Sequence, residues 1–212
     1  MALLLDVSSS MAGDPIEKLS LGLSGLKELV ECDDQASDCI EICIITFGRK
    51  IESTGFHTVD QWVDPVLVAD GLTPTITALE VGLEEIRNRK DLLQSHGITC
   101  RQPAWMVLIT DGFASPSWWL WLNRHPTPKM NLDEVTSTIH ELTAQQNLRF
   151  LGIGSNESSL EMLNILSAPE KAYKIGHHRF EMLFDWITRS IIPASRAVEP
   201  QFLELPPRNW ED

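Results

Sequence analysis

The sequence lacks any apolar run long enough to span a bilayer, and it lacks the common catalytic loop motifs. Of its 212 residues, 43% are hydrophobic and 22% are charged, which is typical of a globular domain. No Gly-x-Ser-x-Gly nucleophile elbow occurs, because Gly22-Leu-Ser24-Gly25 has the wrong spacing. No Walker loop and no Gly-x-Gly-x-x-Gly motif is present. These absences argue against a membrane-spanning protein, an α/β-hydrolase and a nucleotide-binding P-loop enzyme.

Cysteine and positive charge are also scarce. The four cysteines have no zinc-ligand spacing, so we expect reduced thiols at Cys32, Cys39, Cys43 and Cys100. Seventeen Lys and Arg stand against thirty Asp and Glu, a formal net charge of −13. Nucleic acid and anionic membranes both require a cationic surface, so we expect neither as a partner. The apolar run 2–5 is too short for a signal-peptide core, and we expect a cytoplasmic protein.

Segments with a strand pattern alternate with segments of helical spacing along almost the whole chain. The predicted strands are 2–5, 39–47, 51–56, 105–110, 148–154 and 172–175. The predicted helices are 16–31, 75–90, 132–145, 160–166 and 180–192, the last ending at Pro193. This alternation predicts an α/β, Rossmann-like three-layer sandwich, with a mainly parallel central sheet and helices on both faces.

Two further features complete the predicted organisation. The turn Gly48-Arg49-Lys50 is too short for a crossover, so the strand that follows it is expected to be antiparallel and at the sheet edge. One domain is predicted over residues 1–192. Residues 193–212 are expected to form a C-terminal arm or tail.

Polar side chains follow the first predicted strand at the point where it ends. Asp6, Ser8 and Ser10 alternate with other residues, so their side chains can point into one concavity. In open α/β sheets, ligands bind at the carboxyl ends of the strands. One carboxylate and two hydroxyls are hard oxygen donors, the kind that Mg²⁺ or Mn²⁺ accepts. Each residue also has an ordinary interpretation, because Ser and Asp are common helix caps.

Two later segments offer further oxygen atoms to the same edge. The apolar strand 105–110 closes with Asp111-Gly112, so a second parallel strand is expected to deliver a second carboxylate. Between the two strands lies a hydroxyl-rich loop that begins at Gly71 and enters a helix through Thr73-Pro-Thr75. Together these segments predict one metal site rather than several unrelated turns.

The conjunction resembles the von Willebrand factor A (VWA) domain. The metal-ion-dependent adhesion site (MIDAS) of that family has the pattern Asp-x-Ser-x-Ser, then a Thr, then an Asp. By position, the first motif corresponds to Asp6, Ser8 and Ser10, the second to Thr73 and the third to Asp111. The resemblance implies the VWA fold, with a cation that is Mg²⁺ or Mn²⁺ bound directly or through water by these residues.

The resemblance also implies a function. The last coordination position of the cation would be open to an acidic side chain of a protein partner, so the expected role is a non-enzymatic interaction or adaptor domain. Ser9 occupies a position where many members carry Gly, which raises the question of a left-handed backbone there. A metal-dependent phosphohydrolase at the same site and a structural domain with a vestigial site are the alternatives.

Within the family, residues 3–17 and 44–48 are most similar to the bacterial TerY-like branch, which has Ser-Met-x-Gly-x-Pro-Ile after its first metal motif. That branch is associated with tellurite (tellurium) resistance and stress-response signalling, often beside a protein kinase and a metal-dependent serine/threonine phosphatase. The resemblance therefore implies one of these enzymes as a possible partner of this domain.

A cluster of aromatic residues follows the predicted metal carboxylate. Three of the seven tryptophans, Trp118, Trp119 and Trp121, fall within four positions. One interpretation is an insert that packs in a core of its own. The other is an exposed patch that binds a partner, because Trp often anchors protein interfaces.

Overall fold

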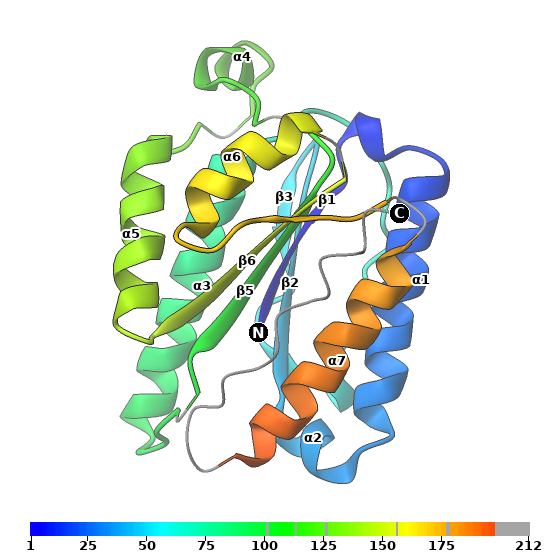
Figure 1. The fold of residues 1–212 in the computed structure, drawn as a ribbon, viewed down its shortest axis with the longest axis vertical. Helices are drawn as coiled ribbons and strands as arrows, with labels where there is room; N and C mark the ends of the chain where they lie inside the picture. Colours follow the sequence, from blue (N-terminus) through cyan, green and yellow to red (C-terminus); the bar gives the residue numbers. More distant parts are fainter. Residues whose placement is uncertain (101, 113, 126, 156, 177–178, 198–212) are drawn as a thin grey trace.

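A computed structural model describes residues 1–197, apart from 101, 113, 126, 156 and 177–178. Figure 1 shows three layers, with a twisted sheet between two sets of helices. The strands are β1 (Ala2–Asp6), β2 (Glu41–Phe47), β3 (Ile51–Ser53), β4 (His57–Thr58), β5 (Ala104–Thr110), β6 (Leu148–Gly154) and β7 (Tyr173–Lys174). The α/β sandwich predicted from the sequence is confirmed.

Seven α-helices and two short 3-10 turns connect these strands within the described residues. The helices are α1 (Asp14–Glu31), α2 (Asp34–Cys39), α3 (Thr75–Ser95), α4 (Ser117–Leu122), α5 (Leu132–Ala144), α6 (Glu157–Ser167) and α7 (Phe180–Arg196). The 3-10 turns are η1 (Ser9–Met11) and η2 (Val59–Gln61). None of the described helices is long and apolar enough to cross a membrane.

The strand order is β3-β2-β1-β5-β6-β7, and β4 pairs with the start of β2. All neighbouring pairs from β2 to β7 are parallel, whereas β3 is antiparallel to β2 at the sheet edge, as predicted. The chain moves outward from β1 to β2 and later from β5 to β7 in the opposite direction. The strand order therefore reverses between β1 and β5, which is where open α/β sheets bind ligands.

Side chains of β1 alternate between the two faces of the sheet. Leu3 and Leu5 pack into the core under α1 and α7, while Ala2 and Leu4 pack into the core under α3, α5 and α6. All four are fully buried. A strand covered on both faces is apolar at every position, so this short run has no polar residue before Asp6.

The helices α1 and α7 meet at a glycine. A Cβ atom at Gly22 would lie 2.4 Å from Cδ2 of Phe184, so only glycine lets the two helices approach this closely. At Gly25 such an atom would meet nothing within 4 Å.

Several predicted boundaries were wrong. Cys39 belongs to the short helix α2 and is exposed, not part of the strand, because Asp33 caps α2 by accepting a hydrogen bond from the Ala36 amide. Helix α3 runs five residues beyond its predicted end. Helix α7 continues through Pro193 to Arg196, because the proline sits in the last turn and the buried stripe continues to Ala194.

Two further predictions concern the cysteines and the C-terminal residues. The four cysteines are free thiols, and Cys43 is the buried one. Most of the predicted C-terminal arm, residues 198–212, lies outside the described residues.

Candidate metal centre

The five predicted ligands come from three segments that meet where the sheet order reverses. Asp6 is the last residue of β1, and Asp111 directly follows β5, its parallel neighbour. The pairing of Leu5 with Ile109 sets both strand ends at the same level of the sheet. Thr73 lies just before α3. The sheet register therefore brings together residues more than one hundred positions apart in the sequence.

Asp6 is fully buried and doubly hydrogen-bonded. Its Oδ1 accepts a hydrogen bond from the Ser8 amide at 2.8 Å, and its Oδ2 accepts one from the Thr110 hydroxyl at 2.5 Å. Burial raises the pKa of Asp6 from 3.8 to about 6, the hydrogen bonds from Ser8 and Thr110 oppose that rise, and the nearby charge of Asp111 adds to it. A buried carboxylate with these neighbours favours a bound cation or a proton.

A chain of hydroxyl contacts connects the β1 loop with Asp111. The Ser8 and Ser10 hydroxyl oxygens are 3.0 Å apart, and the Ser10 hydroxyl donates to Oδ1 of Asp111 at 2.6 Å. Ser8 is 2% exposed and Asp111 is 4% exposed, whereas Ser10 is exposed. The centre therefore has a buried floor and opens to solvent at Ser10.

Gly112 leaves a small space beside the oxygen atoms. A Cβ atom built there would lie 3.4 Å from the Thr73 hydroxyl oxygen and 3.9 Å from the Ser10 hydroxyl oxygen. Both hydroxyls therefore face the same point, where glycine alone contributes no side chain.

The loop that contains Thr73 is held by hydrogen bonds to Ser115, in the segment that follows β5. The Ser115 amide donates to the Thr73 carbonyl at 2.9 Å, and the Thr73 amide donates to the Ser115 hydroxyl at 3.1 Å. This reciprocal pair ties the second predicted motif to the segment that follows the third.

Ser9 is not strained. Among described non-glycine residues, left-handed φ values occur at Arg124 and Gln146, so Ser9 has an ordinary backbone. Its hydroxyl accepts a hydrogen bond from the Gly71 amide at 2.9 Å, and its own amide donates to the Gly71 carbonyl at 3.1 Å. Ser9 thus connects the loop after β1 to the loop that contains Thr73.

Thr110, Gly112 and Ser115 also belong to the candidate centre, although the sequence pattern did not predict them as site residues. Thr110 holds Asp6, Gly112 leaves the space, and Ser115 fixes the Thr73 loop. The position of Thr110 at the end of a strand, directly before a predicted ligand, was the available signal for the first of these.

The donor set fits a small divalent cation. Two carboxylates and three hydroxyls lie in this cluster: Asp6, Ser8, Ser10 and Asp111 follow one another in a chain of contacts, and the Thr73 hydroxyl lies with that of Ser10 beside Gly112. All the donor atoms are hard oxygens. The described residues contain no group of three or more His, Cys, Asp or Glu side chains that could hold a metal. A cation here would therefore depend on hydroxyl and water ligands in addition to carboxylates.

The structure places the predicted tryptophan patch on the surface. Trp118 is 67% exposed, Trp119 39% and Trp121 72%, while Leu120 between them is buried at 1%. The interpretation as a core of its own is therefore wrong, because a six-residue helix turns a single side chain inward. The exposed interpretation stands, and its partner remains a prediction.

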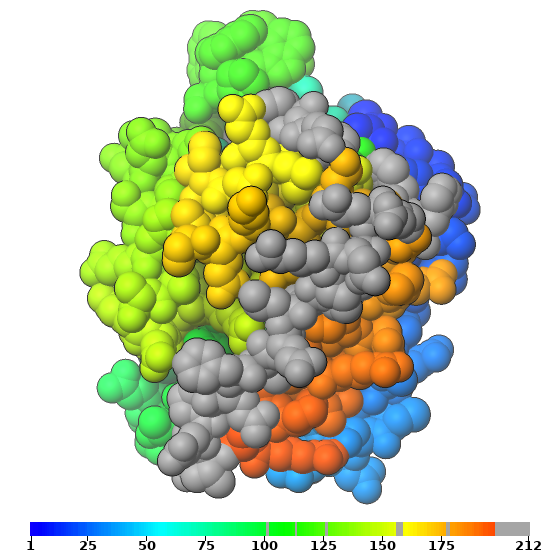
Figure 2. Space-filling view, in the orientation of Figure 1, coloured from blue at the N-terminus to red at the C-terminus, as the bar shows by residue number. Residues whose placement is uncertain are grey.

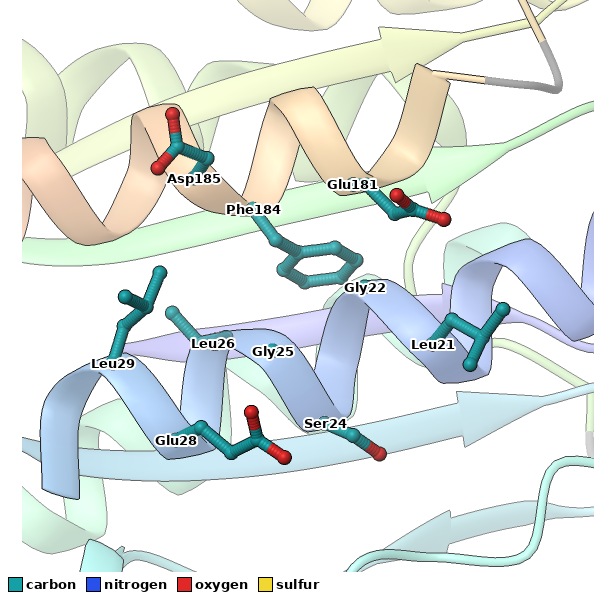
Figure 3. Close-up of a pocket in the computed structure, with 10 residues that line it drawn as sticks. All are labelled: Leu21, Gly22, Ser24, Gly25, Leu26, Glu28, Leu29, Glu181, Phe184 and Asp185. Atoms are coloured by element: carbon teal, nitrogen blue, oxygen red, sulfur yellow. The ribbon is translucent and has the colours of Figure 1, made fainter.

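A surface groove of about 400 Å³ lies elsewhere, between α1 and α7. Figure 3 shows the Phe184 ring directed at Gly22 on the floor of this groove. On its rim, Glu181 and Asp185 already form salt bridges with basic side chains of the two helices. The groove shares no residue with the candidate metal centre.

No protein-family model matches the sequence, and no curated protein does. Solved structures match in fold. The vWF domain of the type V pili tip protein Mfa5 from Porphyromonas gingivalis aligns with a TM-score of 0.60 at 10% identity, over 97% of each chain. A mutant of the PilB minor pilin from Streptococcus sanguinis aligns with a TM-score of 0.60 at 13% identity, over 94% of this chain and 62% of that one.

Proximal thread matrix protein 1 from the mussel byssus aligns with a TM-score of 0.53 at 17% identity, over 88% of this chain. The chain spans only 45% of the mussel protein and 62% of the pilin. At such low identities, the likeness shows the fold alone. The predicted VWA-like fold is confirmed.

Proposed function

We propose that this domain binds Mg²⁺ or Mn²⁺ through Asp6, Ser8, Ser10, Thr73 and Asp111, and that the cation recruits an acidic side chain of a protein partner. The observation that carries this proposal is the contact chain from Asp6 through Ser8 and Ser10 to Asp111, with the Thr73 and Ser10 hydroxyls both beside Gly112, at the reversal point of the sheet.

The side chains have distinct roles in this proposal. The hydroxyls of Ser8, Ser10 and Thr73 supply ligand oxygens, directly or through water. Asp111 orients the Ser10 hydroxyl, with which it already forms a hydrogen bond. Asp6 supplies buried negative charge, and its burial raises the pKa of that carboxyl to about 6.

The opening at Ser10 gives the partner access. Mg²⁺ prefers six oxygen ligands in octahedral geometry and keeps several waters, which exchange with other oxygen ligands. The buried floor formed by Asp6, Ser8 and Asp111 leaves the exposed side for such an exchange. A carboxylate from the partner would complete the coordination there, so binding would require both the cation and the partner's acid.

We propose a binding role rather than catalysis. Phosphoester hydrolysis at a metal centre requires an activated nucleophile and stabilisation of the leaving group, commonly by a second metal or a general base. Two carboxylates meet here, and the described residues contain no larger acidic or histidine cluster. Release of phosphate from a generic phosphoester by the Mg²⁺-loaded protein, lost in Asp6→Ala, would support the phosphohydrolase alternative instead.

Calorimetric titration of the chain with MgCl₂ and MnCl₂ tests the cation site. We expect saturable binding by the unmodified protein, and its loss in Asp111→Ala. Asp64→Ala serves as the matched control, because Asp64 is an exposed loop residue that is not among the five proposed ligands. Equal binding by the unmodified protein and Asp111→Ala, or no binding by either, would refute the proposed site.

The cellular setting is a separate part of the proposal. The TerY-like resemblance suggests a cytoplasmic protein in tellurite resistance or stress signalling, with a protein kinase or a metal-dependent serine/threonine phosphatase as partner. Growth of a gene-deletion strain on tellurite, complemented with the unmodified gene or with Asp6→Ala, tests that setting. Full complementation by Asp6→Ala would separate the phenotype from the cation site.

A further inference from the structure

Helix α4 projects from the molecule beyond the ends of the parallel strands. Figure 1 shows it standing apart from the layers, and Figure 2 shows it as a knob at one end of the molecule. We define its exposed apolar side chains as the aromatic cluster, which consists of Trp118, Trp119, Trp121 and Leu122. Such a concentration of exposed apolar area is costly for an isolated soluble domain and marks interaction sites.

The aromatic cluster has internal order. The rings of Trp118 and Trp119 meet edge to face, with centroids 5.5 Å apart. Leu120 is buried, and the His125 amide donates to its carbonyl at 2.9 Å, which closes the end of the short helix. The indoles are therefore presented on a folded support, so a partner meets them with little loss of conformational entropy.

The segment that precedes α4 is hydrogen-bonded to the candidate metal centre. Ser115 lies two residues before α4 and exchanges two hydrogen bonds with Thr73, a predicted ligand. Only five residues separate Asp111 from the start of the helix at Ser117. A partner whose carboxylate reaches the cation would therefore also lie within reach of the aromatic cluster.

The charge of this segment differs from that of the chain as a whole. The formal net charge is −13, yet residues 112–132 contain no Asp or Glu. The same stretch carries Arg124 and Lys129, both exposed, and neither forms a salt bridge with another described residue. A surface of indoles with unpaired cations complements a partner surface that is apolar and acidic.

We propose that the aromatic cluster is the second half of the interface that begins at the cation. The occupant is a protein segment that places one carboxylate on the cation, apolar side chains against Trp118 and Trp121, and a further acidic group near Arg124. This inference rests on the proposed function, because the same partner contacts both surfaces. Arg and Trp are the residue types that most often dominate interface energetics.

A protein fits these observations better than a membrane does. Tryptophan-rich helices with basic neighbours also lie at membrane surfaces, but an acidic protein is repelled by anionic lipid. The aromatic cluster is moreover tied to a centre whose open side is expected to take a carboxylate, a group that peptides present and that zwitterionic lipid does not.

The test uses a phage-displayed library of random peptides, selected on the immobilised full chain in Mg²⁺. The enriched peptides are then synthesised, and their affinities are measured for the unmodified chain, for Trp118→Ala with Trp121→Ala, and for Asp111→Ala. Leu21→Ala is the matched control, since Leu21 is 57% exposed on α1 and lies outside the candidate centre. Circular dichroism checks that each variant is folded.

We expect the enriched peptides to combine an acidic residue with aromatic or aliphatic residues. Their affinity should fall about thirtyfold or more in the double tryptophan variant, as for interface hot spots. It should be unchanged in Leu21→Ala and lost with chelator. Peptides that require Mg²⁺ but bind the double variant equally well would overturn this inference and leave the proposed function intact.

Three other outcomes would also overturn it. Peptides that bind the unmodified chain equally well with chelator, and bind Asp111→Ala equally well, would refute both this inference and the proposed function. A selection without enrichment of tryptophan-dependent peptides would leave the aromatic cluster without a protein ligand. Sedimentation of the unmodified chain, but not of the double variant, with phosphatidylcholine and phosphatidylserine vesicles would assign the cluster to a membrane surface.

Discussion

In the absence of divalent cation, Asp6 is expected to contribute stability to the folded chain at low pH that is lost at neutral pH. The pKa of Asp6 is 3.8 when the side chain is exposed to water, as in the unfolded chain, and about 6 in the folded chain, where burial disfavours the charged form. The folded state therefore binds a proton more tightly than the unfolded state does. The resulting stabilisation is fully present below about pH 4 and is lost as the pH rises through 6.

The size of this effect follows from the shift. A difference of about two pKa units corresponds to about 3 kcal/mol in the free energy of unfolding, at about 1.4 kcal/mol per unit. Asp33, whose pKa is lowered by the hydrogen bond from Arg196, acts in the opposite direction. The Asp6 contribution is therefore measured as the difference between the unmodified chain and Asp6→Asn, which has no charge to bury.

The assay is urea unfolding followed by circular dichroism, from about pH 4 to pH 7 in chelator. We expect the unmodified chain to lose about 3 kcal/mol relative to Asp6→Asn across this window. Millimolar Mg²⁺ should restore stability at pH 7, because the cation binds only the ionised site. The argument is refuted if the two chains change in parallel with pH, or if the unmodified chain gains stability relative to Asp6→Asn.

Three further predictions concern single residues. Gly112→Ala should weaken Mg²⁺ binding in calorimetry at little cost to stability, because the added methyl group enters the space between Thr73 and Ser10 at an ordinary contact distance. Gly22→Ala should destabilise the fold by about 1–3 kcal/mol in urea unfolding, since the added methyl group would clash with the Phe184 ring. Gly25→Ala is the matched control, because a methyl group there meets nothing within 4 Å, and it should stabilise α1 by up to about 1 kcal/mol. Asn131→Ala should cost about 1 kcal/mol in the same assay, because it removes a capping box at the start of α5, and an unchanged midpoint would contradict that role.

The sequence predicted the larger elements because their signals are local. Residues 41–47 form a strand of β-branched and apolar residues that no helix would favour, and the capped, periodic segment 132–144 is a helix. Short or terminal elements were missed for the opposite reason. Helix α2 has six residues and one capping side chain, and α7 continues past Pro193 because packing outweighs the local cost of the proline.

The composition and motif order of the candidate site were also accessible from the sequence. The five oxygen-bearing residues were identified by residue type and spacing together with the resemblance to the VWA metal motif, which assigned Thr73 in particular. Their mutual geometry was not, because Ser10 and Asp111 are 101 positions apart and meet only through the pairing of β1 with β5. The contributions of Thr110 and Ser115 depend in the same way on contacts between distant segments.

The sequence by itself determined the α/β alternation, the edge strand and the residue types at the strand ends, because backbone propensity and hydrophobic periodicity act over a few neighbouring positions. Only the tertiary structure decided that the three motifs meet at one end of the sheet and that the indoles of α4 face solvent. Burial depends on which surfaces remain after the sheet and helices have packed, and that is a property of the whole chain rather than of any segment.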